Sequence, residues 1–408
     1  MKLRLHKKEA PVLSGAIKIT GSKSESNRLL ILQKLYGDLT IENLSNSDDS
    51  QVMQKALISE EPEVDVHHAG TAMRFLTAYF SIQEGRETIL TGSKRMKERP
   101  IGILVKALRG LGADITYLEN EGYAPLKIKG KILETSAIAL DAHVSSQYIS
   151  ALMMIGAALP KGLTITLIGE PTSVPYIEMT RDLLGQLGIS THFENNKISV
   201  APVQKAEKKT IVVESDWSSA SYYYGLVALS EEAEVTLSSY KKESLQGDSA
   251  LAGIYRKLGV ETVYGETSIK LIKTRDFQPK HQKIDLVNSP DIAQTIAVTC
   301  FGMGIGCELT GLHTLKIKET DRLEALKVEL SKLGANISVT QDSLHLEPTA
   351  VINPDIIIKT YQDHRMAMAF APLAMRVPIY FEDAEVVNKS YPDFWKDLAT
   401  LGINSEEV

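Results

Sequence analysis

Six apolar stretches of helical length recur along the chain, and most of them open with polar or cationic residues. Each stretch predicts a helix, and the six helices begin at Ser24, Gly70, Ser145, Trp217, Pro290 and Asp363. Successive beginnings are separated by 46, 75, 72, 73 and 73 residues. This regular spacing indicates that the chain is built from a repeated structural unit.

A second helix follows each apolar helix, after a short strand and a polar loop. In five units this second helix ends in Leu-Gly, and the pairs are Leu111-Gly112, Leu187-Gly188, Leu258-Gly259, Leu333-Gly334 and Leu401-Gly402. Glycine suits the left-handed position that closes a helix. The sequence therefore predicts an α/β (α+β) fold made of six copies of one βα module, of which the first is trimmed because its gap is short.

The length of 408 residues favours two domains. Three units fill residues 21–214, and three more begin at residue 215. The last unit lacks its closing strands, whereas residues 2–20 have strand-like alternation and no unit of their own. We therefore expect one domain of residues 1–20 plus 215–408 and another of 21–214, with a hinge at the two crossings near 20–21 and 214–215.

Composition and charge narrow the possible partners. The net charge of −6 argues against general nucleic-acid binding. The most apolar run, residues 149–159, is too short to span a membrane, and the basic first residues lead into no apolar signal segment. Two cysteines, Cys300 and Cys307, form no disulfide framework, so a cytoplasmic location is expected.

Cations lie close to the first helix beginning. The segment Gly21-Ser-Lys-Ser-Glu-Ser-Asn-Arg follows a predicted strand and places Lys23, Ser24 and Arg28 in the first turns of a helix. Helix N-termini attract anions through free backbone N–H groups and the macrodipole. A capped helix with exposed cations would give the same pattern, and the spacing of a P-loop is absent.

Small and hydroxyl-bearing residues open the next helices. Gly70 would let a ligand approach backbone amides closely, and Arg99 ends a run of cations just before a further helix. Two other entries are rich in hydroxyl and amide groups, namely Ser145, Ser146 and Gln147 in one and Ser173 in the other. Helix capping explains each of these residues singly, while together they also suit sugar-like or phosphate groups.

The second half of the chain carries the candidate acid/base residues. Lys318, Glu319 and Arg322 stand at i, i+1 and i+4, so a helix would place the two cations on one face with the carboxylate beside them. Such a carboxylate fits an acid/base role. A surface ladder of salt bridges is the alternative.

Three further residues belong to the last two units. Asp291 lies early in an apolar helix, where it is either a first-turn residue favoured by the dipole or a general base. Arg365 lies in the first turn of another apolar helix, where a cation opposes the dipole unless an anion binds there. Lys389 lies in the loop of the last unit. No metal-ligand spacing, nucleophile elbow or dinucleotide fingerprint occurs, so neither a metal nor a cofactor is expected.

Six of these motifs resemble, in order and over essentially the whole chain, those of the 3-phosphoshikimate 1-carboxyvinyltransferase family. They are Gly21-Ser-Lys-Ser-Glu-Ser-Asn-Arg, Ala69-Gly-Thr-Ala-Met-Arg, Arg95-Met-Lys-Glu-Arg-Pro, Ser145-Ser-Gln, Lys318-Glu-Thr-Asp-Arg and Asp363-His-Arg-Met-Ala-Met. The resemblance implies two similar domains, each of three βαβαββ units. It also implies metal-free transfer of the enolpyruvyl group from phosphoenolpyruvate to the 5-hydroxyl of 3-phosphoshikimate, and sensitivity to glyphosate.

The resemblance also implies roles for individual residues. It assigns 3-phosphoshikimate to Lys23, Ser24, Arg28, Ser145, Ser146, Gln147, Ser173, Asp291, Thr314 and Lys318. It assigns phosphoenolpyruvate to Lys23, Gly70, Arg99, Gln147, Arg322, Arg365 and Lys389. The implied catalytic residues are Asp291 as the base for the 5-hydroxyl, Glu319 as the proton donor to the vinyl carbon, and Lys23 as the proton donor to phosphate. His68 and Thr314 stand where the family usually has asparagine.

Two alternatives remain open at this point. A sister enolpyruvyl transferase acts on UDP-N-acetylglucosamine and typically uses a loop cysteine, whereas Cys300 and Cys307 lie around the end of an apolar helix. A non-catalytic anion-binding protein on the same scaffold would lack a catalytic residue, whereas Asp291 and Glu319 are both present. A monomer acting on small-molecule substrates is expected.

Overall fold

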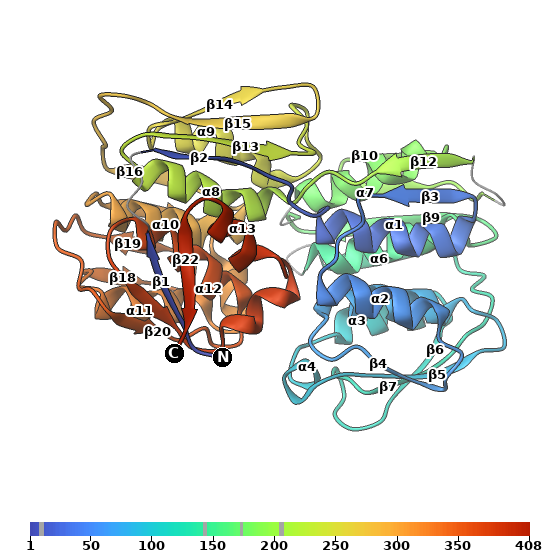
Figure 1. Cartoon of the computed structure of the whole chain (residues 1–408). Coiled ribbons are helices and arrows are strands. Elements are labelled where there is room, and N and C mark those ends of the chain that lie inside the picture. The colour runs from blue at the N-terminus through green and yellow to red at the C-terminus, as the bar shows by residue number, and fades with distance from the viewer. Residues whose placement is uncertain (8–11, 142–144, 172–173, 204–207) are drawn as a thin grey trace. The chain divides into compact units, whose positions relative to one another are not determined.

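The chain folds into two compact units (Figure 1). The computed structural model describes residues 1–7, 12–141, 145–171, 174–203 and 208–408. Unit 1 comprises Met1–Thr20 and Glu214–Val408, and unit 2 comprises Gly21–Val213. The second division falls one residue before the expected boundary, because Glu214 is buried among residues of unit 1. Its carboxylate accepts hydrogen bonds from Trp217 Nε1 and the Lys241 amide, both at 2.8 Å.

Unit 1 contains three four-stranded sheets within its described residues. Each sheet has one parallel and two antiparallel strand pairs. In order of neighbours, the first sheet consists of β20 (Ile356–Ile358), β21 (Ile379–Phe381), β1 (Leu3–Lys7) and β22 (Ile403–Glu407). The second consists of β14 (Val260–Tyr264), β15 (Ser268–Lys273), β13 (Ala233–Ser238) and β2 (Leu13–Ile17). The third consists of β16 (Gln282–Asp285), β17 (Cys307–Thr310), β19 (Leu344–Leu346) and β18 (Ile337–Val339).

The N-terminal segment completes two of these sheets. Strand β1 pairs with β21 and β22 of the last repeat, and β2 pairs with β13 of the fourth repeat. The termini lie close together (Figure 1), and the amide of Val408 donates to the carbonyl of Lys2 at 3.1 Å. This pairing confirms that the opening segment supplies strands that the C-terminal unit lacks.

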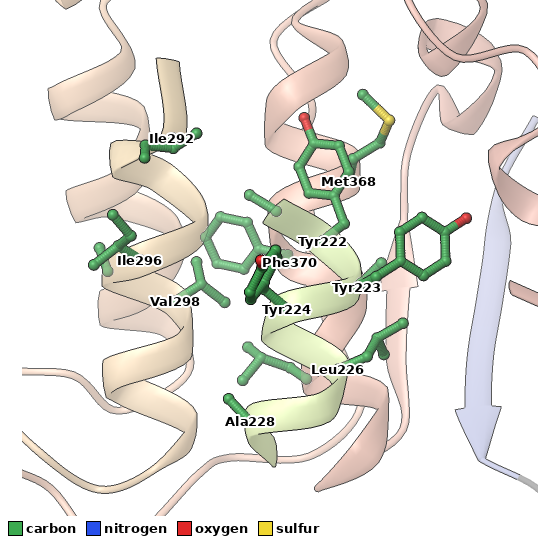
Figure 2. Close-up of a cluster of buried hydrophobic side chains, with 14 of the residues drawn as sticks. Tyr222, Tyr223, Tyr224, Leu226, Ala228, Ile292, Ile296, Val298, Met368 and Phe370 are labelled. Atoms are coloured by element: carbon green, nitrogen blue, oxygen red, sulfur yellow. The ribbon is translucent and has the colours of Figure 1, made fainter. Parts of the chain in front are cut away.

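Apolar helices form the centre of unit 1. Helices α8 (Trp217–Leu229), α10 (Ala293–Gly302) and α12 (His364–Phe370) pack against one another, and all their residues are buried. Figure 2 shows the aromatic and aliphatic side chains that these helices bring together. The remaining helices are α9 (Leu251–Arg256), α11 (Arg322–Lys332) and α13 (Phe394–Thr400), with short 3-10 segments η1 (Gly247–Ala250), η2 (Pro290–Ile292), η3 (His313–Ile317), η4 (Ala371–Met375) and η5 (Ala384–Lys389).

Unit 2 has the same plan, but one of its three repeats is shortened. Its two four-stranded sheets are β10 (Thr191–Glu194), β11 (Lys197–Val200), β9 (Leu163–Ile168) and β8 (Ala137–Asp141), and β4 (Glu63–Asp65), β5 (Glu87–Thr91), β7 (Leu126–Lys129) and β6 (Asp114–Tyr117). The first repeat of the chain contributes to a two-stranded sheet within the described residues, made of β3 (Leu39–Glu42) and β12 (Lys209–Val212). Its second helix leads directly to β4 without a hairpin, as the short first gap predicted.

The helices of unit 2 form two sets, an inner set that packs together and an outer set, just as α8, α10 and α12 are the inner helices of unit 1. The inner helices α1 (Lys23–Tyr36), α3 (Gly70–Ser81) and α6 (Ser146–Gly156) pack against one another. The others are α2 (Asp48–Ile58), α4 (Lys94–Lys97), α5 (Gly102–Gly110) and α7 (Val174–Gln186).

The repeated Leu-Gly pairs close helices as expected. The five glycines all have left-handed backbone angles, with φ between 77° and 107°. Each of these helices therefore ends at its Leu-Gly pair. A hairpin follows in four of the five cases, whereas α13 leads into the single strand β22, which pairs with β1.

The core of unit 1 should tolerate little loss of volume. Val298 on α10 is fully buried (Figure 2), whereas Val351 is 67% exposed. Val298→Ala should lower the free energy of unfolding of unit 1 by about 1.5–3 kcal/mol, because it removes two buried carbon atoms and leaves a cavity. Val351→Ala should change it by less than about 0.5 kcal/mol. Denaturant titrations of both variants decide, and equal losses would contradict this packing.

Candidate functional site

The buried guanidinium of Arg322 is the centre of the candidate site in unit 1. Arg322 begins α11, and its side chain is 2% exposed. Nε donates to Asp363 at 2.6 Å, Nη1 to Asp291 at 2.9 Å and Nη2 to Glu319 at 2.8 Å. The rigid guanidinium fork thus brings together carboxylates from three separate segments.

Asp291 is the most cation-rich carboxylate of this cluster. Besides Arg322, it lies 3.2 Å from Nη2 of Arg365 and 3.7 Å from Nζ of Lys318. Burial alone would raise the pKa of Asp291, but Arg365, Lys318 and Arg322 together hold it well below its usual range. Asp291 is therefore a carboxylate at neutral pH and can accept a proton.

Lys318 and Glu319 lie in a loop rather than on a helix, so their predicted helical face is wrong. Helix α11 begins only at Arg322, because Asp321 caps it by accepting a hydrogen bond from the Glu324 amide at 3.1 Å. Glu319 and Lys318 are nevertheless beside Arg322 and Asp291. The surface-ladder alternative is also wrong, since Arg322 is buried. Asp291 raises the pKa of Lys318, but burial and Arg322 outweigh it and the net pKa is lowered.

The other predicted residues of unit 1 lie around this cluster. Arg365 occupies the second position of α12, and its buried Nε has no hydrogen-bond partner among the described residues. Lys389 donates from Nζ to the carbonyl of Gln362 at 2.6 Å. Thr314 lies in η3, and its buried hydroxyl also lacks a partner within the described chain. The Arg365 and Lys389 nitrogens can donate hydrogen bonds to a ligand, and the Thr314 hydroxyl can donate or accept one.

The sequence did not reveal two carboxylates of this region. Asp363 is fully buried, caps α12 and pairs with Arg322; its place at a helix beginning was the available signal. Asp248 in η1 is also buried, and burial together with Asp291 raises its pKa to about 8, although Arg365 acts in the opposite direction. No local pattern marks Asp248, because its environment comes from distant segments.

In unit 2, the predicted residues Lys23, Ser24 and Arg28 lie on the first turns of α1. Ser22 caps this helix, and Nζ of Lys23 lies 3.3 Å from Asp49 Oδ2. Ser24 is partly buried, and its carbonyl accepts a hydrogen bond from Nη1 of Arg28 at 2.8 Å. Lys23 therefore forms an ion pair with Asp49 next to the start of α1.

Arg28 is a buried cation. It is 2% exposed and donates to Thr180 Oγ1 at 2.7 Å and to Ser150 Oγ at 2.9 Å. Burial lowers the pKa of Arg28 to about 10. No carboxylate forms an ion pair with Arg28 within the described part of the chain. Among the described residues, the hydrogen-bond partners of this buried cation are thus neutral, although the charge of the nearby Glu25 carboxylate also acts to raise its pKa.

Helix α3 begins without a side-chain cap at Ala69. The guanidinium of Arg99 lies over its first residue, because a Cβ added to Gly70 would be 2.6 Å from Arg99 Nη1. Nε2 of Gln147 donates to Thr71 Oγ1 at 3.1 Å, which ties the start of α6 to the start of α3. Uncapped amides beside a cation form a favourable environment for an anion.

The hydroxyl-rich entry to α6 is a helix cap. Ser145 accepts a hydrogen bond from the Gln147 amide at 3.3 Å, and Ser146 is buried as the first residue of the helix. His68 shares a hydrogen bond of 2.8 Å with Ser93 through Nδ1. Ser173 lies outside the described residues.

Two absences hold within the described residues. No helix of this part of the chain is long and apolar enough to cross a membrane. No group of three or more His, Cys, Asp and Glu side chains within it could hold a metal ion.

The family model for EPSP synthase (3-phosphoshikimate 1-carboxyvinyltransferase) matches residues 54–398. A 3-phosphoshikimate 1-carboxyvinyltransferase from Bacteroides fragilis (strain YCH46) is 47% identical over 394 residues, which cover 96% of each chain. One from Vibrio campbellii is 36% identical over 419 residues, covering 95% of this chain and 97% of the relative.

Solved structures show the same fold. An EPSP synthase from Acinetobacter baumannii superposes with a TM-score of 0.81 at 21% identity, over 100% of this chain and 99% of that one. The enolpyruvyl transferase NikO from Streptomyces tendae gives 0.74 at 14% identity, with the same coverage. These likenesses confirm the predicted fold class. By its sequence relatives and the family match, this chain belongs to the EPSP synthase (3-phosphoshikimate 1-carboxyvinyltransferase) family.

Proposed function

We propose that this protein transfers the enolpyruvyl group of phosphoenolpyruvate to the 5-hydroxyl of 3-phosphoshikimate, in the shikimate pathway of aromatic amino acid biosynthesis. The observation that carries the proposal is the 47% identity to a 3-phosphoshikimate 1-carboxyvinyltransferase over 96% of both chains. Release of phosphate from the two substrates together, and from neither alone, is the direct test. The products are 5-enolpyruvylshikimate 3-phosphate and phosphate.

Phosphoenolpyruvate is assigned to a set of cations, amides and one glycine. The uncapped start of α3 at Gly70, with Arg99 beside it, supports this assignment in unit 2, together with Gln147 and Lys23. In unit 1, Arg365 has an unpartnered buried Nε, and Lys389 and Arg322 supply further charge. Arg322 already binds three carboxylates, so it would act mainly by holding Asp291 and Glu319 in place.

3-Phosphoshikimate is assigned to hydroxyl groups and cations. Arg28 supports this assignment, because a buried cation without a carboxylate partner favours a bound anion. Ser24, Ser145, Ser146, Ser173 and Gln147 complete the set in unit 2, with Lys23 facing both substrates. Asp291, Thr314 and Lys318 are the corresponding residues of unit 1.

The reaction requires one base and one acid. Asp291 would take the proton of the 5-hydroxyl while the hydroxyl oxygen attacks C2 of phosphoenolpyruvate. At the same time Glu319 would give a proton to C3, so that a methyl group forms. In the second step a methyl proton returns to Glu319, and phosphate leaves with a proton from Lys23. An anion that draws Arg365 or Lys318 away from Asp291 would raise the basicity of this carboxylate.

The two alternatives lack support in the site. Cys300 on α10 and Cys307 on β17 are both fully buried, and hydrogen bonding to Cys307 and burial raise the pKa of Cys300, so neither resembles a reactive loop thiol. A non-catalytic protein would not need Asp291 and Glu319 held by one arginine. We also infer a cytoplasmic monomer in which the crossings at 20–21 and 213–214 form the hinge.

Glu319→Gln tests the acid/base assignment. The amide keeps the shape of the side chain but cannot shuttle a proton, so turnover should fall by about 100- to 10,000-fold. Glu324→Gln, on the exposed side of α11 next to Lys327, is the matched control and should retain normal turnover. Phosphate-release rates at saturating substrates are the measurement. Near-normal turnover of Glu319→Gln would remove Glu319 from the mechanism.

Gly70→Ala tests the phosphoenolpyruvate assignment in unit 2. The added methyl group would meet Arg99, so the KM for phosphoenolpyruvate should rise by more than the KM for 3-phosphoshikimate, and inhibition by glyphosate should weaken. Gly185→Ala on α7 is the control, because its added methyl group meets no atom within 4 Å. Equal glyphosate inhibition of the wild type and Gly70→Ala would show that Gly70 does not contact the donor.

Asp248→Asn tests the raised pKa of this buried carboxyl. The folded protein keeps the Asp248 proton up to about pH 8, whereas the ordinary pKa is 3.8. This group therefore favours the folded state at low pH, and its contribution is lost as the pH rises through 8. The unfolding free energy of Asp248→Asn, relative to that of the wild type, should increase between pH 5 and pH 9. A flat difference would contradict the shift.

A further inference from the structure

We propose that Glu329 is a positioning residue for phosphoenolpyruvate binding, although it lies two helical turns from Arg322 and outside the residues assigned to either substrate. It would act through Tyr361 and the backbone of Lys359, which belong to the segment that leads into α12. The proposal rests on the proposed function, because Glu329 would act by positioning Arg365 and Lys389, which are assigned there to phosphoenolpyruvate.

The carboxylate of Glu329 is fully buried, and both of its oxygens accept hydrogen bonds. It accepts hydrogen bonds from Tyr361 Oη at 2.7 Å and from the Lys359 amide at 3.2 Å. Lys332, one turn further along α11, contacts both carboxylate oxygens at 2.7 Å and balances the charge. Burial, followed by the hydrogen bond to Glu329, raises the pKa of Tyr361 above its usual range, so the phenol remains a donor.

A buried ion pair is a poor way to gain stability alone, because desolvation offsets the attraction. An apolar residue could fill the same space on α11, but it could not accept hydrogen bonds from Tyr361 and Lys359. The two acceptor contacts are therefore what the carboxylate adds at this position.

The segment that Glu329 holds has an unusual backbone. Tyr361 and Gln362 are consecutive residues with left-handed angles, φ 53° and φ 55°. A bulky side chain such as that of tyrosine disfavours this conformation, so the surrounding contacts must stabilise it. The hydrogen bond from Tyr361 to Glu329 is one such contact at the strained residue itself.

The same segment delivers the site residues. The carbonyl of Gln362 accepts the hydrogen bond from Lys389 Nζ, and the next residue, Asp363, caps α12 and binds Arg322. Arg365 follows two positions later and contacts Asp291. A change in the Tyr361–Gln362 backbone would therefore displace a lysine contact and the start of α12 together.

Helix α11 fixes both ends of this segment. Arg322 and Glu329 are seven residues apart, which places them on one face of the helix, and both are buried. Glu329 binds the segment at Lys359 and Tyr361, and Arg322 binds it at Asp363. The helix thus sets the distance between the strained turn and the carboxylate cluster.

The test compares Tyr361→Phe and Glu329→Gln with the wild type. Tyr361→Phe keeps the aromatic ring and removes only the donated hydrogen bond, so it should fold normally. Both variants should raise the KM for phosphoenolpyruvate by about tenfold, the effect of one charge-assisted hydrogen bond, and change the KM for 3-phosphoshikimate by less than about twofold. Glu329→Gln removes the charge and one of the two acceptor oxygens. The double variant should be little worse than the more affected single variant, because both changes weaken the same link.

Lys332→Gln separates positioning from general stability. It removes the charge partner of Glu329 but leaves both hydrogen bonds to the segment, so it should lower the melting temperature without the tenfold rise in KM. Amide hydrogen exchange of residues 359–365 should accelerate in Tyr361→Phe and Glu329→Gln but not in Lys332→Gln.

The outcomes also distinguish this proposal from the proposed function. A wild-type protein without phosphate release would overturn the proposed function and the role in phosphoenolpyruvate binding with it. If the wild type is active, two results would overturn the positioning role alone. One is an unchanged KM for phosphoenolpyruvate in Tyr361→Phe. The other is a rise in this KM in Lys332→Gln as large as that in Tyr361→Phe.

Discussion

The charge of one buried arginine determines the local arrangement of unit 1. A guanidinium that is 2% exposed must be neutralised within the protein, because an uncompensated buried charge costs several kcal/mol, about 3–5 when a partner is removed. Arg322 meets this requirement with carboxylates from η2, from the loop before α11 and from the start of α12. Three segments that are distant in sequence are thereby fixed around one group, which leaves Asp291 and Glu319 at defined positions.

A buried arginine of unit 2 has a different environment, although both units repeat one module. Arg28 is as buried as Arg322, yet its contacts among the described residues are hydroxyl groups, carbonyl groups and aromatic rings. Neutral contacts lower the cost of desolvation without cancelling the charge. An anionic ligand would therefore gain more from Arg28 than from Arg322, whose charge is already balanced. We therefore propose two electrostatic roles on the shared fold, anion binding by Arg28 and placement of carboxylates by Arg322.

Periodic features were predictable from the sequence because they are local. The helix starts and the Leu-Gly stops depend on backbone geometry within a few residues, and both lie where the sequence placed them. Contacts between distant segments were not predictable: Asp363 pairs with Arg322 across 41 residues, and Asp248 owes its raised pKa to groups on other elements. The loop conformation of Glu319 was missed for a related reason, since helical spacing alone gave no sign that Asp321 starts α11.

The burial of the inner helices restricts where the proposed chemistry can take place. Every residue of α8 and α10 is buried, so no side of these helices is available to a substrate. Only the first turns remain, where backbone N–H groups lack partners within the helix. Ser22, Ser145, Asp216 and Asp363 satisfy these groups with their side chains at four helix starts. Helix α3 has no such cap, and Arg99 beside Gly70 adds a positive charge there, so an anion is the partner that would satisfy both.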